Sequence, residues 1–308
     1  MLQPMPFIVA SPRSGTMLLG VMLGAHPDMA ISPKTGFFPG LAEACTTAAD
    51  PHAAFVAALT DPKVAPAWRD WHIAEADVRR VIDTVRPFDL SDAIRALYGL
   101  LAQRMGKPRY GDRTPRNLLA MTAIADILPE AHFIHIIRDG RAQFLSARKA
   151  GWGAADPAMG ARGWVRAVRQ GQRTGRTLPH YLEIRYEDLV LSTEHELRRL
   201  CHFLDLPWHP AMLDYTGHAA ERLAERHDTA GFSADARKSL HRNVLHAPMA
   251  SRIDAWRAEL SEEDVRRFDA EAGDLLRELG HPVSGDADWD IGLARYAEPR
   301  HGMAFATP

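Results

Sequence analysis

Short segments of strand length alternate with longer segments of helical periodicity along most of the chain. The segments of strand length are extended or apolar and are bounded by Pro, Gly or polar residues. They are Phe7–Ala10, Arg109–Asp112, His132–Ile137 and Tyr181–Arg185. Because successive strands that each feed a helix pair in parallel, this order predicts an α/β fold with a central parallel sheet and flanking helices.

Helices are predicted between and after these strands from apolar periodicity and from signals at their ends. Thr114 is expected to cap a helix that has Pro115 at its first position, and Asp139 is expected to cap the helix after the third strand. The predicted segments are Met17–Leu23, Thr114–Leu128, Asp139 to about Lys149, Ala158–Arg173 and Thr193–Leu204.

The clearest helix lies near the C-terminus. Ser261 and Asp264 form a capping box, and Gly280 followed by Pro282 ends the helix. Its apolar stripe consists of Val265, Phe268, Ala272, Leu275, Leu276 and Leu279. Residues 283–308 contain Gly, Asp and Pro and are predicted to form an irregular tail, so residues 1–282 are predicted to be one domain.

A helical insertion is predicted from about residue 37 to residue 106, where Pro residues break several helical patterns and Leu90–Met105 is amphipathic. Its large apolar side chains are candidates for an acceptor pocket or for plain core, and core is the commoner role of such residues. They include Phe37, Phe38, Phe55, Trp68 and Trp71.

Composition limits the binding partners and the cellular compartment that are expected for this chain. The 308 residues are 46% hydrophobic and 25% charged with a net charge of -2, so no basic excess points to a nucleic acid or an anionic membrane. Cys45 and Cys201 are far apart and lack metal-ligand spacing, which favours a reducing compartment and no metal site. No secretory or membrane-spanning segment is recognisable, so a cytoplasmic location is expected. The sequence leaves open whether the chain forms a homo-oligomer.

The segment Ala10–Thr16 lies where the first strand turns into a helix, so its backbone N–H groups and the helix dipole can hold a phosphate, with Arg13 adding charge. Compared with the phosphate loop G-x-x-x-x-G-K-[ST], Gly15 matches the last Gly. Thr16 replaces the Lys, and Met17 replaces the hydroxyl that binds magnesium. The loop therefore predicts an anion site without the metal anchor of an ATP- or GTP-hydrolysing enzyme.

With this loop the chain resembles the sulfotransferase superfamily, whose 5′-phosphosulfate loop reads Lys or Arg, Ser, Gly, Thr after the first strand. Arg138 and Ser146 match the family's Arg and Ser that hold the 3′-phosphate. Three more segments are similar to the bacterial and tyrosylprotein-type branches and extend the resemblance from residue 7 to about residue 280. They are Gly111–Pro115, Arg185–Leu189, and Ala250–Arg252 followed by Trp256.

The resemblance implies a P-loop-like three-layer fold and a reaction that uses 3′-phosphoadenosine 5′-phosphosulfate (PAPS) without a metal and releases 3′,5′-ADP. Arg13 and the loop N–H groups would neutralise the leaving 5′-phosphate, since such transfer depends on positioning and electrostatic support. Arg113 would touch the sulfuryl oxygens or, alternatively, cap the following helix. The predicted nucleotide-binding residues are Arg13, Ser14, Gly15, Thr16, Met17, Arg138, Ser146, Tyr186, Ser251 and Arg252.

The family's usual general base is missing. Relatives place a Glu shortly after a His-Pro-Asp that ends the first helix, but this chain has Lys34 there and Gly36 where many relatives have His. Three interpretations stay open. Asp112, or less favourably His135, takes the proton; Lys34 binds an anionic acceptor or acts as a base with a lowered pKa; or a phenolic acceptor needs little help.

The sequence thus predicts an enzyme that moves a sulfuryl group from PAPS to a hydroxyl or amine of a small molecule, glycan or peptide. Two alternatives come from different functional classes. One is a non-catalytic 3′,5′-ADP-binding protein on the same scaffold, and the other is a small-molecule kinase with a diverged phosphate loop.

Overall fold

A computed structural model describes residues 2–229 and 231–291. A parallel sheet of order β1-β4-β5 lies at its centre, with Phe7 beside Phe133 and Phe133 beside Tyr181. β2 and β3 form a second parallel pair, and Asp112 joins it to the first sheet through a bridge to Phe7. The strands are β1 (Met5–Val9), β2 (Met29–Ile31), β3 (Arg109–Gly111), β4 (Ala131–Ile137) and β5 (Tyr181–Arg185). The predicted α/β fold with a central parallel sheet is confirmed.

Helices cover both faces of the sheet, so β1 and β4 are buried throughout. Ile8 and Ile134 point to the face covered by α1 (Thr16–Gly24), α9 (Tyr186–Leu191) and α10 (Thr193–Phe203). Phe7 and Phe133 point to the opposite face, because successive side chains of a strand alternate. This gives the three layers that the sequence predicts.

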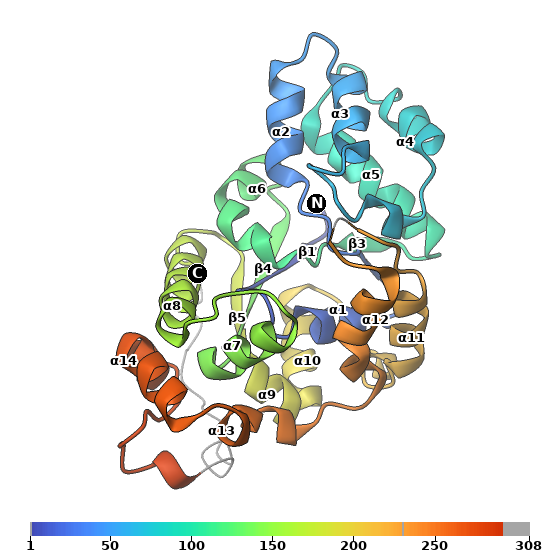
Figure 1. Cartoon of the computed structure of the whole chain (residues 1–308). Helices are drawn as coiled ribbons and strands as arrows, with labels where there is room; N and C mark the ends of the chain where they lie inside the picture. The colour runs from blue at the N-terminus through green and yellow to red at the C-terminus, as the bar shows by residue number, and fades with distance from the viewer. Residues whose placement is uncertain (1, 230, 292–308) are drawn as a thin grey trace.

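The predicted insertion is helical and packs as one group at the top of Figure 1. Its aromatic side chains form core, because Trp71 is fully buried with its ring centroid 5.1 Å from that of Tyr98. The elements are α2 (Phe38–Thr47), α3 (Pro51–Thr60), the 3₁₀ helix η1 (Trp68–Trp71), α4 (Glu75–Ile82) and α5 (Leu90–Arg104). The domain boundaries themselves stay a prediction.

The single helix predicted from Thr114 to Leu128 is wrong. The structure has a 3₁₀ helix, η2 (Pro115–Ala120), followed by α6 (Met121–Ile127). The Thr114 hydroxyl does not cap the helix, because it donates to Asp112 at 3.3 Å and accepts from the Thr35 N–H at 3.3 Å. Distant partners thus replace the local cap.

Two other predicted caps are confirmed. The Asp139 carboxylate accepts from the Arg141 N–H at 2.8 Å at the start of α7 (Gly140–Lys149). Ser261 Oγ accepts from the Asp264 N–H at 3.1 Å at the start of α14 (Glu262–Glu278), which packs on α8 (Pro157–Gly175).

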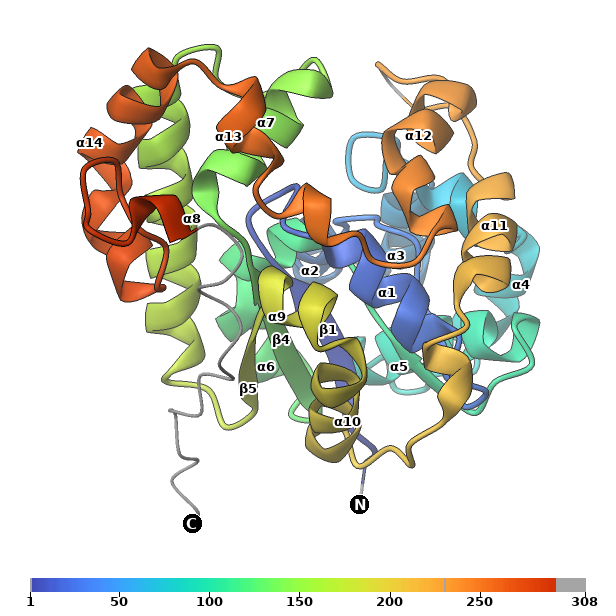
Figure 2. The same ribbon diagram turned by 90° about the horizontal axis from the view of Figure 1, so that it is seen from below.

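The chain after α10 crosses the ends of α1 and α9 before it reaches α13, as Figure 2 shows. No helix of this stretch, α13 included, was predicted. Its elements are η3 (Pro210–Met212), α11 (Thr216–Ala224), α12 (Ala234–His241), η4 (Arg242–Leu245), η5 (Ala250–Arg252) and α13 (Ala255–Glu259). Of the predicted irregular tail, residues 283–291 are turns and a short 3₁₀ segment, and residues 292–308 lie outside the described residues. Within residues 2–229 and 231–291, no helix has the length and apolar character needed to cross a bilayer.

Candidate functional site

A cavity of about 610 Å³ opens beside the N-terminus of α1 and the loop that follows β4. The edge of the insertion at Ala67 and the segment from Arg226 to Arg252 complete its wall. This is the edge formed by the carboxyl ends of the parallel strands, where open α/β sheets bind ligands. The cavity is therefore the candidate functional site.

The loop between β1 and α1 forms one side of the cavity. Arg13 has a φ of +75°, a strained conformation for a non-glycine residue that is typical of functional sites. Gly15 has a φ of +108°, and a Cβ on it would lie 2.5 Å from the Tyr186 ring, so only glycine fits. The first N–H groups of α1 have no partner within the helix and are free to bind an anion.

The second predicted anion-binding segment meets this loop directly. Arg13 Nε donates to Ser146 Oγ at 3.1 Å, and both residues line the cavity. The Arg138 guanidinium lies 4.3 Å from the Tyr186 ring centroid and donates to the carbonyl oxygens of Arg13 at 3.3 Å and Arg252 at 3.0 Å. The structure thus brings residues from four distant segments together around one space.

Cationic side chains dominate the cavity lining, and within the described chain no Asp or Glu lines it. The pKa of Arg13 is lowered to about 10 by burial and by the nearby charges of Arg138 and Arg252. Such mutual repulsion would be relieved by a bound anion. The lining cations are Arg13, Lys34, Arg113, Arg116, Arg138, Arg226, Arg237 and Arg252.

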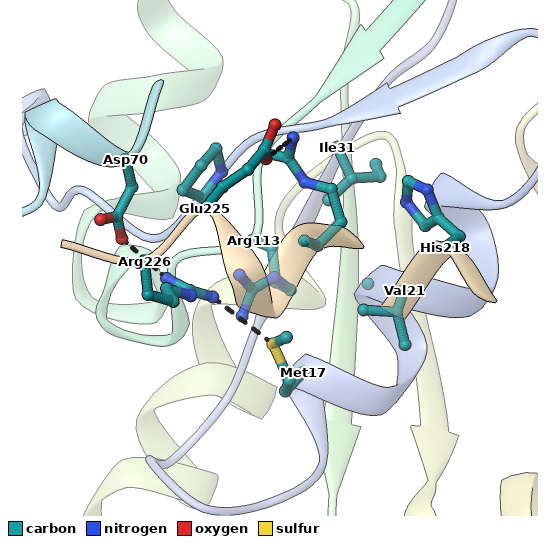
Figure 3. Close-up of a pocket in the computed structure, with 11 residues that line it drawn as sticks. Met17, Val21, Ile31, Asp70, Arg113, His218, Glu225 and Arg226 are labelled. Atoms are coloured by element: carbon teal, nitrogen blue, oxygen red, sulfur yellow. Dashed lines mark hydrogen bonds and ion pairs between the residues drawn. The ribbon is translucent and has the colours of Figure 1, made fainter. Parts of the chain in front are cut away.

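Arg113 is buried in an unusual way, because its side chain is 7% exposed and makes no hydrogen bond or ion pair with any described residue. It passes close to α1, where a Cβ on Gly20 would lie 2.0 Å from Arg113 Cδ. Burial and the neighbouring Arg226 lower its pKa to about 9. Figure 3 shows Arg113 beside Arg226 and Met17, in a smaller cavity of about 20 Å³ that adjoins the large one. Its guanidinium therefore has no direct hydrogen-bond or ion-pair partner in the described chain, and the nearby carboxylates of Asp112 and Asp70 only partly offset its charge.

Asp70 ties the insertion to the segment that closes the cavity. It lies on η1, is 2% exposed, and accepts from Arg226 Nη1 at 2.9 Å and Arg237 Nη2 at 2.5 Å (Figure 3 shows the Arg226 contact). Although burial acts to raise its pKa, hydrogen bonds from Arg237 and the His227 N–H hold the pKa below its usual value. The ionised carboxylate thus positions two of the lining cations.

The structure does not bring Asp112 to the cavity. Its carboxylate is 1% exposed and accepts from Ser32 Oγ at 2.9 Å, Tyr98 Oη at 2.9 Å and Asn117 Nδ2 at 2.8 Å. Those donors occupy the oxygens that a base would use, so Asp112 holds the loop after β3 instead. His135, the weaker candidate, is fully buried and hydrogen-bonds to Tyr181 Oη at 2.7 Å.

The remaining predicted residues divide between the cavity and its surroundings. Thr16, Met17 and Lys34 line it, whereas Ser14 is buried behind the loop and Ser251 is exposed on η5 outside it. Lys34 projects its exposed side chain into the cavity. Desolvation there, followed by the charges of Arg116 and Arg113, lowers its pKa.

Four ionisable lining residues escaped the sequence analysis: Arg116, Arg226, Arg237 and His241. Arg116 follows Pro115 in a recognised segment and could have been proposed from its position. The other three lie more than 75 residues beyond Arg138. Arg226 follows α11, and Arg237 and His241 lie on α12; neither helix was predicted, so no local pattern pointed to them.

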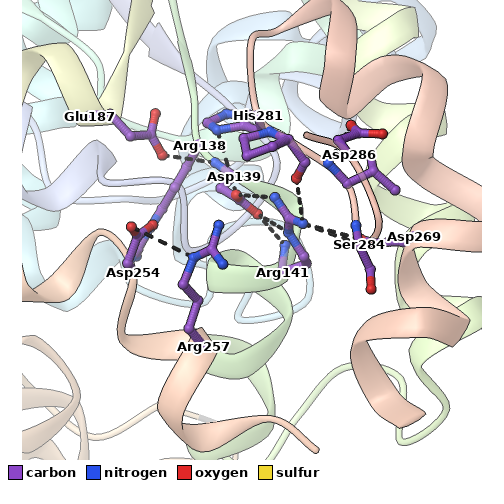
Figure 4. Close-up of polar contacts among 12 residues, drawn as sticks. Arg138, Asp139, Arg141, Glu187, Asp254, Arg257, Asp269, His281, Ser284 and Asp286 are labelled. Carbon is purple, nitrogen blue, oxygen red and sulfur yellow. Dashed lines mark hydrogen bonds and ion pairs between the residues drawn. The ribbon is translucent and has the colours of Figure 1, made fainter. Parts of the chain in front are cut away.

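A buried ionic network lies behind Arg138 and fixes the start of α7. Arg141 is 0% exposed and pairs with Asp139 at 2.8 Å and with Asp269 of α14 at 3.3 Å (Figure 4). Glu187 of α9 accepts from the Asp139 N–H at 3.0 Å. Because Ser146 lies on α7 as well, this network holds both residues of the second anion-binding segment in place.

Comparisons with known proteins agree with this geometry. The model of a family described as "Sulfotransferase family" matches residues 4–210. The chain is 27% identical over 286 residues to protein-tyrosine sulfotransferase 1 of Danio rerio, covering 90% of this chain and 72% of the relative. It is also 27% identical over 287 residues to a putative protein-tyrosine sulfotransferase of Caenorhabditis briggsae, covering 90% and 89%.

Two solved structures have a similar fold. The sulfotransferase domain from the curacin biosynthetic pathway superposes with a TM-score of 0.55 at 20% identity, covering 92% of this chain and 99% of that one. The sulfotransferase domain from the Synechococcus PCC 7002 olefin synthase gives a TM-score of 0.51 at 21% identity, covering 87% and 94%.

Proposed function

The chain belongs to the sulfotransferase family, and on that premise we propose that it transfers a sulfuryl group from PAPS to an acceptor hydroxyl or amine. The observation that carries the proposal is the contact of Arg13 Nε with Ser146 Oγ at 3.1 Å inside one cavity. A nucleotide with phosphates at both its 5′ and 3′ positions needs two anion sites facing the same space.

The lining residues suit this donor. Arg13 and the N–H groups at the start of α1 would hold the 5′-phosphosulfate, whose leaving oxygen gains negative charge during transfer. Arg138 and Ser146 would hold the 3′-phosphate, and Tyr186, already stacked on Arg138, would lie near the adenine. Arg113 would meet the sulfuryl oxygens, because it is a buried cation without a partner in the described chain.

The donor needs no metal in this scheme. The cationic lining supplies the positive charge that magnesium provides in the sites of enzymes that bind nucleoside triphosphates. Among the described residues no cluster of three or more potential metal ligands occurs. Arg252 and the rest of its segment would close over the nucleotide.

For the acceptor we propose a phenolic hydroxyl. The names of both relatives state tyrosine as the acceptor, and a phenol has a reference pKa near 10, so it loses its proton far more readily than an aliphatic alcohol. Lys34, Arg113, Arg226 and Arg237 would attract negative charge next to that hydroxyl. The cytoplasmic location expected from the sequence stays a prediction.

A thermal-shift comparison of 3′,5′-ADP with 5′-AMP tests the proposal. At about 100 times its dissociation constant, a ligand adds about 2.7 kcal/mol to the free energy of unfolding, and only 3′,5′-ADP should do so at a matched concentration. Equal shifts with both nucleotides would favour a kinase-like ATP site, and no shift with either would end the proposal.

Arg138→Ala sharpens this test. It should lower the affinity for 3′,5′-ADP by about 10- to 100-fold and leave 5′-AMP binding nearly unchanged, because charge-assisted hydrogen bonds to a phosphate contribute about 1.5–3 kcal/mol. Arg148→Ala is the matched control, since Arg148 lies on α7 but pairs with Asp264 at 2.9 Å outside the cavity. Tight 3′,5′-ADP binding without transfer to any phenol would indicate the non-catalytic alternative.

A further inference from the structure

The cavity offers few groups that can accept a proton. In the described part of the chain its lining contains no carboxylate, and Asp112 is sealed behind it by its hydrogen bonds. Lys34 is a cation in its ordinary state and must lose a proton before it can accept one. Tyr186 is 9% exposed and is covered by Arg138. The imidazole that lines the cavity, His241, is the remaining candidate.

His241 is held close to the proposed 5′-phosphosulfate site. It is the last residue of α12, and the carbonyl oxygen of the preceding residue, Leu240, accepts from Arg13 Nη2 at 3.4 Å. The ring of His241 makes no hydrogen bond to any described residue. Its ring nitrogens are not among the fully buried polar atoms that lack a partner, so they are accessible. A ring nitrogen is therefore available to a ligand in the cavity.

The charges around His241 keep its ring neutral. Burial, and then the guanidinium groups of Arg226, Arg13, Arg113 and Arg237, lower its pKa well below the usual value. Asp70, an acid close to this group, is already paired with Arg226 and Arg237. An unprotonated imidazole is the form that can act as a base.

We propose that His241 is the general base that takes the proton of the acceptor hydroxyl, an inference that rests on the proposed sulfuryl transfer. As the acceptor oxygen bonds to sulfur, an imidazole nitrogen accepts the hydroxyl proton. The bond between sulfur and the 5′-phosphate oxygen breaks, and its electron pair stays on that oxygen beside Arg13. The imidazolium then releases its proton to solvent.

The charge of the donor makes this assignment consistent with neutral pH. Binding a nucleotide with several negative charges offsets the cations around His241 and raises its pKa from the depressed value of the free protein. A base is most effective when its pKa lies near the working pH. The pKa of His241 thus approaches the working pH only when the donor is bound.

The reverse reaction tests the role with defined probes. Wild type and His241→Gln are given 3′,5′-ADP with either phenyl sulfate or 4-nitrophenyl sulfate, and release of the phenol is measured. In this direction the imidazolium protonates the leaving phenolate. Unsubstituted phenolate is strongly basic and needs this proton to leave, whereas 4-nitrophenolate is weakly basic and leaves without it. His241→Gln should lower kcat/KM about 10²- to 10⁴-fold for phenyl sulfate and less than about 10-fold for 4-nitrophenyl sulfate.

His246→Gln is the matched control. His246 lies on the same segment, its carbonyl oxygen accepts from Tyr215 Oη at 2.6 Å, and its side chain does not line the cavity. This variant should behave as wild type with both sulfates. Equal losses with the two sulfates in His241→Gln would indicate a structural role only, and no loss would remove His241 from the reaction.

A measurement without turnover covers the case in which aryl sulfates are poor substrates. The pKa of His241, followed by NMR with ¹³C-labelled histidine and assigned with His241→Gln, should rise when 3′,5′-ADP binds. An unchanged pKa of His241 with normal 3′,5′-ADP binding would overturn its assignment as the base but not the proposed function. Absence of 3′,5′-ADP binding to wild type would overturn the proposed function, and the base with it.

Discussion

Two arginines are buried to nearly the same degree but lie in opposite surroundings. Arg141 is 0% exposed and pairs with the carboxylates of Asp139 and Asp269 (Figure 4). Arg113 is 7% exposed and has no hydrogen-bond or ion-pair partner among the described residues (Figure 3). Removing a charge from water costs several kcal/mol; among the described residues Arg141 has ion-pair partners that offset this cost, and Arg113 has none.

The difference distinguishes a structural charge from a charge that, under the proposed function, serves a ligand. The paired Arg141 joins α7 to α14 and so holds the start of the second anion-binding segment. The unpaired Arg113 faces a cavity with other cations, and burial with Arg226 lowers its pKa to about 9. Burial alone does not distinguish the two roles; the presence of a partner does.

The largest effect is expected from Arg141→Met, which removes the guanidinium that pairs with the buried carboxylates of Asp139 and Asp269. The free energy of unfolding, measured by urea denaturation, should fall by about 3–5 kcal/mol. Arg162→Met is the control, because it removes only a surface pair between Arg162 of α8 and Glu271 of α14, and should cost less than about 1 kcal/mol. Similar losses in both variants would contradict the structural role.

Arg113→Met should have a smaller effect, and on a different quantity. The affinity for PAPS should fall about 10- to 150-fold, since hydrogen bonds to charged groups contribute about 1.5–3 kcal/mol, while affinity for 3′,5′-ADP stays within about threefold. The free energy of unfolding should be unchanged or higher, because an uncompensated charge is removed. Calorimetric titration and denaturation measure the two quantities, and lost stability with unchanged PAPS affinity would reverse the comparison.

The smallest effect concerns pH. Burial acts to raise the pKa of Asp139, but the charges of Arg141 and His281 hold it below its usual value. The unfolded chain binds a proton near pH 4 whereas the folded chain does not, so the stabilisation is present above pH 4 and is lost as the pH falls. Asp139→Asn should therefore cost about 1–2 kcal/mol more at pH 7 than at pH 3. An equal or larger cost at pH 3 would disprove this coupling.

Local patterns were sufficient for four of the five strands and for two helix caps; the short β2 (Met29–Ile31) was not predicted. The apolar runs around Phe7 and Phe133 are strands wherever they pack, and the caps at Asp139 and Ser261 bond to N–H groups a few residues away. The prediction failed at Thr114, whose hydroxyl is bound by distant residues. It also missed α12, which has no fully buried residue and so lacks the apolar stripe that reveals a helix.

The sequence by itself determined the α/β order and the position of the two predicted anion-binding segments at strand ends, because a strand, a loop and a helix start are defined by neighbouring residues. Only the tertiary structure decided that Arg13 meets Ser146 and that Asp112 is sealed away from the cavity. The same holds for His241, which enters the site from an unpredicted helix. The burial of a charged side chain and its ion-pair partners depend on contacts between residues that are far apart in the chain. Those contacts decide whether the charge stabilises the fold or stays available to a ligand.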